Sequence, residues 1–201
     1  MDHPLRLVVG LGNPGEAYRA TRHNAGFWFV DRLAQQQASV LRQESRFFGA
    51  LARLRHQSGE CWLLEPGTFM NLSGRSVGAL VNYYQLLSAE VLVVHDELDL
   101  EPGVVRLKKG GGSAGHNGLK DITAVLGTPD YWRLRIGVGR PGGSRDLAGY
   151  VLDRPSAAEQ EAIEASLERA LEVFPLLLAG HLAQATKQLH TLVRPSPPLP
   201  A

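Results

Sequence analysis

The sequence has one cysteine, Cys61, among 201 residues, and this count excludes a disulfide within the chain. A single thiol in the apolar segment CWLLE is typical of a buried core side chain rather than of a nucleophile or a metal ligand. No apolar run reaches the roughly 18 residues that cross a bilayer, and the first ten residues lack the charged and then apolar layout of a secretory signal. We therefore expect a cytoplasmic protein without a membrane span.

A large excess of charge is also absent, because the formal net charge is only +1. The distribution is uneven, however: residues 101–145 contain eight basic and three acidic side chains, a local net charge of +5. Such a stretch is either an ordinary solvated face or a surface for a polyanion, and charge alone leaves both interpretations open.

Length and patterning predict one domain of the α/β class, because roughly 100–200 residues is the usual domain size. Apolar runs bounded by glycine, proline or acidic residues predict strands near 5–10, 47–54, 61–65, 91–95, 104–108 and 133–138. Helical spacing predicts helices over 24–41, 74–87, 119–127, 155–174 and 175–192, the last of them starting at Pro175. We expect a twisted mixed sheet flanked by helices, with the carboxyl-terminal helices packed across its surface. Residues 1–193 form this domain, and residues 194–201 (RPSPPLPA) a disordered tail.

The segment GLGNPG, residues 10–15, has the spacing of the dinucleotide fingerprint G-x-G-x-x-G. A dinucleotide site needs a helix that opens directly at the third glycine and an acidic residue about 20 positions later. Here the turn-like EAYRATRHNAG follows, and position 35 falls within AQQQ. A second copy, GGGSAG at 110–115, has no well-placed acidic residue either. The context therefore argues against a nicotinamide or flavin cofactor.

Two segments, GRSVG and GGSAG, have the G-x-S-x-G pattern of a nucleophile elbow, centred on Ser76 and Ser113. Ser76, Asp96 and His116 even follow the chain order of the α/β-hydrolase triad. An elbow requires a strand directly before the serine, whereas GTFMNLSG before Ser76 is typical of a loop. This context argues against a nucleophile elbow at Ser76. A serine esterase that uses Ser76 or Ser113 nevertheless remains the alternative function.

Small polar residues stand where apolar elements end, and open α/β sheets place ligands at strand ends. Asn13 closes the first strand, His23 precedes the first helix, and Asp96 ends the strand VLVVHD. Asn71 and Asn117 lie in two further loops. Each has an ordinary structural explanation when taken singly, since asparagine is common in turns and a histidine is often a surface residue.

Four segments together resemble the bacterial peptidyl-tRNA hydrolase family: VVGLGNPGEAYRATRHNAGFWFVDRLA, PGTFMNLSGRSV, VVHDELDLEPGVVRLKKGGGSAGHNGLKDI and RLRIGVGRP. They span residues 8–141 in the family's order and spacing, while the carboxyl-terminal helices match the family's layout more than its sequence. One departure is Ser113-Ala114, where the family commonly has histidine and glycine before GHNG.

The resemblance implies a monomeric α/β hydrolase, without metal or cofactor, that cleaves the ester between a peptide carboxyl and the 3′-terminal ribose of tRNA. By position, His23 is the general base, Asp96 supports it, and Asn13 helps to distinguish N-blocked substrates from free aminoacyl-tRNA. The residues that contact the substrate's terminal region are Tyr18, Phe69, Asn71 and Asn117. The residues that grip the acceptor arm through its phosphates are Arg106, Lys108 and Arg135. The chemistry is coherent, because one positioned water and a base of near-neutral pKa suffice to hydrolyse an ester.

Overall fold

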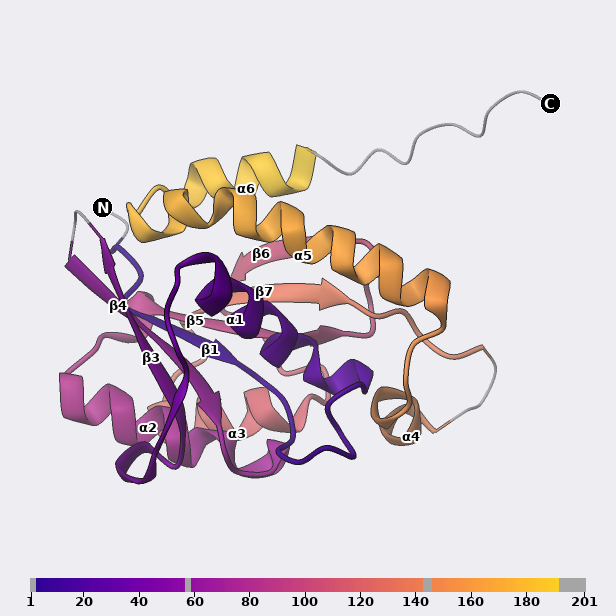
Figure 1. Cartoon of the computed structure of the whole chain (residues 1–201), viewed down its shortest axis with the longest axis horizontal. Coiled ribbons are helices and arrows are strands. Elements are labelled where there is room, and N and C mark those ends of the chain that lie inside the picture. The colour runs from indigo at the N-terminus through magenta and orange to yellow at the C-terminus, as the bar shows by residue number, and fades with distance from the viewer. Residues whose placement is uncertain (1–2, 57–58, 143–145, 192–201) are drawn as a thin grey trace.

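A seven-stranded mixed sheet forms the centre of the computed structural model, which describes residues 3–56, 59–142 and 146–191 (Figure 1). The spatial order is β2-β3-β4-β1-β5-β7-β6. Strands β4, β1, β5 and β7 run parallel, whereas β2, β3 and β6 are antiparallel to their neighbours. The bounds are β1 Leu7–Gly10, β2 Arg42–Glu44, β3 Gly49–His56, β4 Gly59–Pro66, β5 Val91–Glu97, β6 Val105–Lys109 and β7 Trp132–Gly137. The predicted α/β class and mixed sheet are confirmed.

Helices cover both faces of the sheet, and each face has its own apolar cluster. One face carries α1 (Ala25–Gln36), α5 (Ala157–Leu178) and α6 (Leu182–Thr191), and the other carries α2 (Ser73–Tyr84) and α3 (Asn117–Leu126). A sixth helix, α4 (Leu147–Leu152), lies beside the turn that precedes α1. Because both faces are covered, every residue of the central strands β1 and β5 is buried. Continuous apolar runs such as VLVV are expected for strands in that position.

The glycines of GLGNPG allow close packing of α1 on β1. A Cβ on Gly10 would lie 2.4 Å from the carbonyl oxygen of Gly26 in α1, and a Cβ on Gly26 would lie 2.3 Å from the backbone nitrogen of Leu11. Residues 15–21 after the pattern form turns rather than a helix. Gly10 is therefore explained by helix-on-strand contact and Gly12 by the nearby ring of Phe27, whereas Gly15 has open space around it and adopts a positive φ of 103°.

Two predicted helix boundaries are wrong. The sequence places a helix start at Pro175, but Pro175 lies inside the last turn of α5, and the next helix begins only at Leu182, after the chain reverses at Gly180 (φ 78°). A proline inside a helix costs about 3 kcal/mol, and burial of Phe174 and Leu177 on the core offsets this cost. The helix predicted over 24–41 ends at Gln36, because Ala38 adopts a left-handed conformation (φ 49°).

Two short elements, β2 and α4, were not predicted, although Asp146 directly before α4 is an N-cap residue. β2 is the polar tripeptide RQE, fully exposed, and its pairing with β3 defines it.

Within the described residues, no helix is both long and apolar enough to cross a membrane. The tail predicted to be disordered, residues 194–201, lies outside the described part of the chain.

Candidate active site

A cavity of about 650 Å³ opens at the carboxyl ends of β1 and β5. The chain leaves β1 toward β4 on one side, and β5 pairs with β1 on the other, so the strand order reverses at this point. A reversal of strand order leaves a crevice at the strand ends, which is the usual ligand position in such sheets. The wall of the cavity includes six of the predicted site residues: Asn13, His23, Phe69, Asn71, Asp96 and Asn117.

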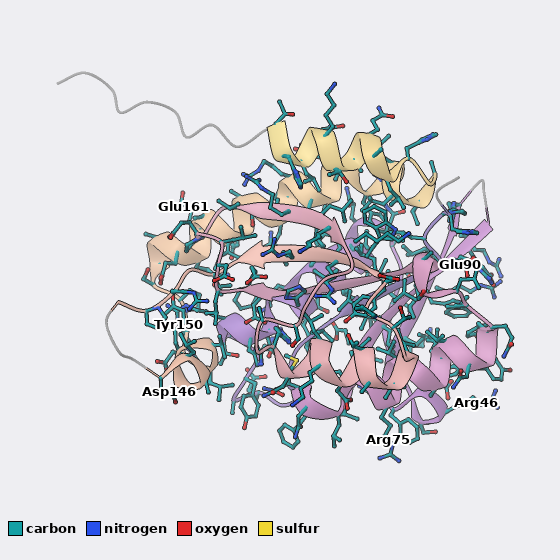
Figure 2. The ribbon with its side chains drawn as sticks, turned by 180° about the vertical axis from the view of Figure 1, so that it is seen from behind. Arg46, Arg75, Glu90, Asp146, Tyr150 and Glu161 are labelled. Carbon is teal, nitrogen blue, oxygen red and sulfur yellow. The ribbon has the colours of Figure 1, made fainter. Side chains whose placement is uncertain are left out.

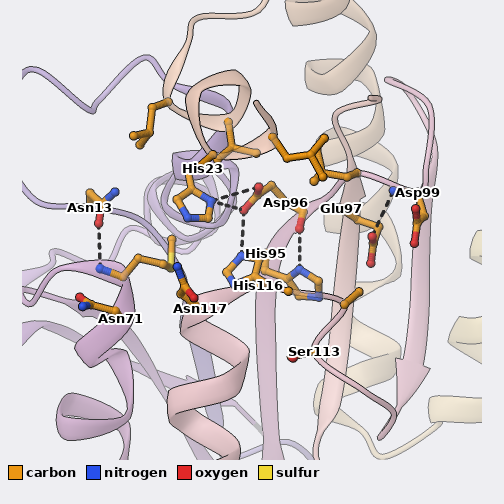
Figure 3. A pocket seen from close by; sticks show the side chains of 18 of the residues that line it. Asn13, His23, Asn71, His95, Asp96, Glu97, Asp99, Ser113, His116 and Asn117 are labelled. Atoms are coloured by element: carbon orange, nitrogen blue, oxygen red, sulfur yellow. Dashed lines mark hydrogen bonds and ion pairs between the residues drawn. The ribbon is translucent and has the colours of Figure 1, made fainter. Parts of the chain in front are cut away.

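His23 and Asp96 form a hydrogen-bonded pair in this cavity (Figure 3). His23 lies in a short 3₁₀ turn just before α1, and Asp96 lies near the end of β5. The Nδ1 atom of His23 is 2.9 Å from Oδ1 and 3.1 Å from Oδ2 of Asp96. An ionised carboxylate only accepts hydrogen bonds, so Nδ1 carries the proton. The Nε2 atom of the neutral ring is then left as a proton acceptor.

The pKa values of the pair shift in opposite directions. Burial by itself lowers the pKa of His23, but the charge and hydrogen bond of Asp96 outweigh it and raise the His23 pKa above its usual 6.5. Burial works to raise the pKa of Asp96, but the two neighbouring histidines, His23 and His116, hold it well below its usual range. Asp96 therefore stays ionised, and His23 titrates above 6.5.

His116 is a second partner of Asp96, with its Nε2 atom 3.0 Å from Oδ1 of Asp96. Its Nδ1 atom accepts a hydrogen bond of 3.4 Å from the backbone N–H of Leu119, which makes His116 the N-cap of α3. Since Nδ1 accepts, Nε2 carries the proton and donates to Asp96. The sequence considered His116 only as a partner for a serine.

A metal ion is the other arrangement that this group suggests, since ligand atoms of His23, Asp96 and His116 lie within 4.8 Å of one another. A metal would need the lone pair of His116 Nε2. Nδ1 would then carry the proton and point it at the N–H of Leu119, which now donates to that nitrogen. The three residues therefore suit a network of hydrogen bonds better than a metal site.

His95 is a buried histidine that the sequence did not select. Its Nδ1 donates to the backbone carbonyl of Asp96 over 2.6 Å, while Nε2 is buried without a hydrogen-bond partner among the described residues. Burial and the neighbouring His116 lower the pKa of His95 to about 3, so this ring is neutral. His95 lines the same cavity as His23 and Asp96 and adds no charge to this cavity.

Asn13 has a fixed orientation. Its Oδ1 atom accepts a hydrogen bond of 2.8 Å from the backbone N–H of Met70 (Figure 3). The side-chain amide of Asn24 also bonds the backbone of Asn13 in both directions, at 2.9 Å and 3.0 Å. Because Oδ1 is occupied, the NH₂ group of Asn13 remains to donate. Asn24 thus fastens the strand end that carries Asn13 to the turn that carries His23.

Of the substrate candidates, Asn71, Asn117 and Phe69 line the cavity, whereas Tyr18 does not. Asn71 lies in the 3₁₀ turn before α2, and Asn117 is the first residue of α3. Phe69 is 55% exposed and meets the ring of Tyr18 edge to face at 6.1 Å. The amino-terminal ends of helices carry positive partial charge, so the starts of α2 and α3 favour negative charge near Asn71 and Asn117.

The glycine-rich loop, residues 110–116, is anchored by Arg133. The buried guanidinium of Arg133 donates to the carbonyl oxygens of Gly112 at 2.6 Å and Gly111 at 2.7 Å. Ala114 adopts a left-handed conformation with φ 47°. The glycine common at that position in the resembled family adopts such a conformation without the steric cost that a Cβ adds.

Three basic candidates for tRNA binding lie beside the cavity rather than in it. Arg106 and Lys108 are on one face of the edge strand β6, and Arg135 is paired with Arg106 across the β6–β7 ladder. Lys108 is exposed, whereas Arg135 is half-buried and donates to Glu97 over 2.9 Å. Several charges of the basic stretch therefore have internal partners, and Lys108 is the more available cation.

Neither serine of the alternative function has the geometry of an elbow nucleophile. Ser76 is fully buried inside α2 and donates to the carbonyl oxygen of Phe47 over 2.6 Å. Ser113 lies in the glycine-rich loop, which continues into the cap of α3 rather than turning directly from a strand into a helix. His116, the histidine of the proposed triad order, has both ring nitrogens occupied, by Asp96 and by the backbone N–H of Leu119, so neither is left for a serine. Cys61 is buried in β4, where burial raises the pKa of its thiol far above the usual range.

The fold and the site together define the class of protein: a single α/β domain with a histidine–aspartate pair in the cavity at its strand ends. A sequence model of the family described as peptidyl-tRNA hydrolase matches residues 7–196. The chain belongs to the peptidyl-tRNA hydrolase family.

Individual relatives agree with this assignment over nearly the whole chain. A peptidyl-tRNA hydrolase of Leptothrix cholodnii is 51% identical over 197 residues, which cover 98% of this chain and 92% of that protein. A peptidyl-tRNA hydrolase of Polynucleobacter asymbioticus is 53% identical over 192 residues, which cover 92% and 98%. The crystal structure of peptidyl-tRNA hydrolase from Acinetobacter baumannii superposes with a TM-score of 0.89 at 44% identity, over 92% of this chain and 94% of that one.

Proposed function

We propose that this protein hydrolyses the ester between the carboxyl group of a peptide and the 3′-terminal ribose of tRNA, with water as the nucleophile. One observation carries the proposal: Asp96 holds Nδ1 of His23, so that Nε2 remains as a base beside three asparagines. A free acid and a free tRNA are the products. We further propose that the protein acts as a monomer in the cytoplasm, where its substrate arises.

The reaction needs one proton acceptor that later becomes a donor. Nε2 of His23 takes a proton from water as the water oxygen bonds to the ester carbonyl carbon. The tetrahedral intermediate then collapses, the bond from carbon to ribose oxygen breaks, and the imidazolium returns the proton to that oxygen. Asp96 stabilises the imidazolium between these steps and fixes the ring. General-base assistance of this kind contributes about 10²–10⁴-fold in rate.

Asparagines suit the rest of the site, because they donate and accept hydrogen bonds without a titrating charge. Asn71 and Asn117 lie at helix starts, where the backbone also favours the negative charge of the oxyanion. Asn13 has only its NH₂ group free, as a donor. That donor suits the carbonyl of an N-acyl group and repels the ammonium of a free aminoacyl ester. Asn13 therefore favours N-blocked substrates.

The tRNA is held by its terminal base and by its phosphates. The exposed ring of Phe69, with Tyr18 against it, offers a surface on which the terminal adenine stacks. The cations Arg106, Lys108 and Arg135 bind phosphates of the acceptor arm, and they supply affinity without taking part in the chemistry.

Lys108→Ala is the cleaner test of phosphate binding, since Lys108 is exposed and Arg135→Ala also strips Glu97 of its partner. Each phosphate contact contributes roughly −0.7 to −0.9 to the slope of log affinity against log salt. We expect Lys108→Ala, and likewise Arg135→Ala, to weaken tRNA binding and to reduce that slope by about one contact. Turnover of an N-blocked aminoacyl ester of adenosine stays near the wild-type rate.

Arg55→Ala is the matched control. It removes one exposed cation from β3, which lies toward the opposite edge of the sheet from β6. It leaves the slope nearly unchanged. Wild-type salt slopes and affinities for both Lys108→Ala and Arg135→Ala would mean that the tRNA binds elsewhere.

The function itself is tested by incubating the protein with N-acetyl-aminoacyl-tRNA and, in parallel, with the same tRNA carrying the free amino acid. We expect release of the N-acetyl amino acid and little or no release of the unblocked one. Release from both substrates would refute the role of Asn13. Release from neither would refute the proposed activity.

A further inference from the structure

The helix α4 forms one wall of the cavity although it contains only six residues. A helix shorter than about 12 residues is marginal by itself in water, so contacts elsewhere must hold α4 in place. It contributes Leu147, Ala148, Val151 and Leu152 to the wall, and Leu98 from the segment after β5 lies with them. Leu147 and Leu152 remain 40% and 42% exposed.

Arg22 makes contacts that hold α4 in place. Its Nη1 atom donates to the carbonyl oxygens of Tyr150 at 3.3 Å, Asp153 at 3.2 Å and Arg154 at 3.0 Å. Its Nη2 atom pairs with Glu159 at 2.9 Å. The last carbonyls of a helix have no partners within the helix and favour a cation beside them. The buried Arg22 therefore caps the carboxyl end of α4.

The same residue is joined to the catalytic turn. Arg22 directly precedes His23, and its backbone N–H donates to the carbonyl of Asp153 over 3.2 Å. Its guanidinium also lies 4.0 Å from the ring centre of Tyr150, the α4 side chain labelled in Figure 2. Arg22 therefore links the position of α4 to the position of the turn that carries His23.

The cavity has two chemically different walls. Asn13, Asn71 and Asn117 line it with amides, and the α4 side lines it with aliphatic side chains. Amides form hydrogen bonds with a peptide backbone. Exposed leucines, by contrast, stabilise a complex only when an apolar group of the ligand covers them. Because Arg22 ties α4 to His23, the aliphatic wall stands beside the bond that is cleaved.

We propose that this aliphatic wall is a subsite for an apolar side chain on the amino acid esterified to tRNA, and that Arg22 is the positioning residue that holds it beside His23. The inference rests on the proposed function and adds a substrate preference to it. Burial of a leucine side chain, which glycine lacks, favours binding of the leucyl ester. Partial burial in this cavity corresponds to about a tenfold preference over glycine.

The test compares one tRNA that carries either N-acetyl-leucine or N-acetyl-glycine, so that only the side chain differs. We expect the wild-type kcat/KM to favour the leucyl ester by about tenfold. Leu152→Ser should reduce this preference to less than threefold, while Leu87→Ser, which changes an exposed leucine outside the cavity lining, leaves it intact.

Arg22→Met should reduce the same preference by raising KM for the leucyl ester more than for the glycyl ester. Arg22→Lys keeps one cation but offers no planar fork, and we expect an intermediate preference. A purely structural role would lower kcat/KM for both esters by the same factor, and that result would overturn the positioning role.

Three outcomes separate the claims. Equal wild-type kcat/KM for the two esters would refute the subsite while leaving the hydrolase activity intact. Loss of the preference in Leu152→Ser supports the subsite even if Arg22→Met does not fold, and Arg22→Lys then tests the positioning role. Hydrolysis of neither ester would refute the proposed function instead.

Discussion

We expect His23→Ala to lower kcat by about 10²–10⁴-fold, because this substitution removes the acceptor for the proton of the attacking water. The affinity for tRNA should stay close to the wild-type value, since the proposed phosphate contacts lie on β6 and β7. Single-turnover hydrolysis of N-acetyl-aminoacyl-tRNA and equilibrium binding of deacylated tRNA measure the two quantities separately.

His181→Ala provides the control, because His181 is an exposed histidine between α5 and α6 and does not line the cavity. That variant should keep the wild-type rate. If His23→Ala retained most of its activity, the base would have to be another group, and the proposed mechanism would be wrong.

Asp96→Asn should reduce kcat on the order of 10²-fold and move the acid limb of the pH profile to lower pH. In the wild type, Asp96 raises the pKa of His23 above 6.5, so kcat/KM increases with pH through a value above 6.5. An asparagine keeps the ring buried but removes the attractive charge. Burial then dominates, and the pKa of His23 falls below 6.5.

The same variant gives a check on stability. A histidine whose pKa is raised on folding contributes stability that is present below pH 6.5 and is lost as the pH rises through the folded pKa. We therefore expect Asp96→Asn to destabilise the protein more at pH 6 than at pH 9, as measured by denaturant unfolding. In the kinetic experiment, an acid limb of the pH profile that stays in place in Asp96→Asn, or moves to higher pH, would contradict the proposed effect of Asp96 on the pKa of His23.

The strands were largely predictable because buried parallel strands have continuous apolar sequences, such as LVVG in β1 and VLVV in β5. The wrong helix start at Pro175 and the missed helix α4 depend on contacts remote in sequence. Pro175 remains inside α5 because the side chains around it are buried on the sheet, and α4 depends on the guanidinium of Arg22. A local pattern contains neither contact.

The candidate site divides in the same way. His23, Asp96 and three asparagines were selectable because polar residues at the ends of apolar elements interrupt a pattern, and because the segments around them resemble a family. His116, His95 and Arg22 were not selected, since their roles exist only through partners elsewhere. His116, for example, bonds both Asp96 and the backbone of Leu119.

The sequence by itself determined the class of fold, the approximate strands and the set of polar residues at strand ends, because these depend on periodicity and on the identity of neighbours along the chain. Only the tertiary structure decided which nitrogen of each imidazole carries the proton. It also decided that the NH₂ group of Asn13 is free to donate and that Arg22 contacts the end of α4. These properties depend on hydrogen bonds between segments that lie far apart in sequence, such as the bond from Arg22 to the carbonyl of Asp153. Only folding brings such partners within reach.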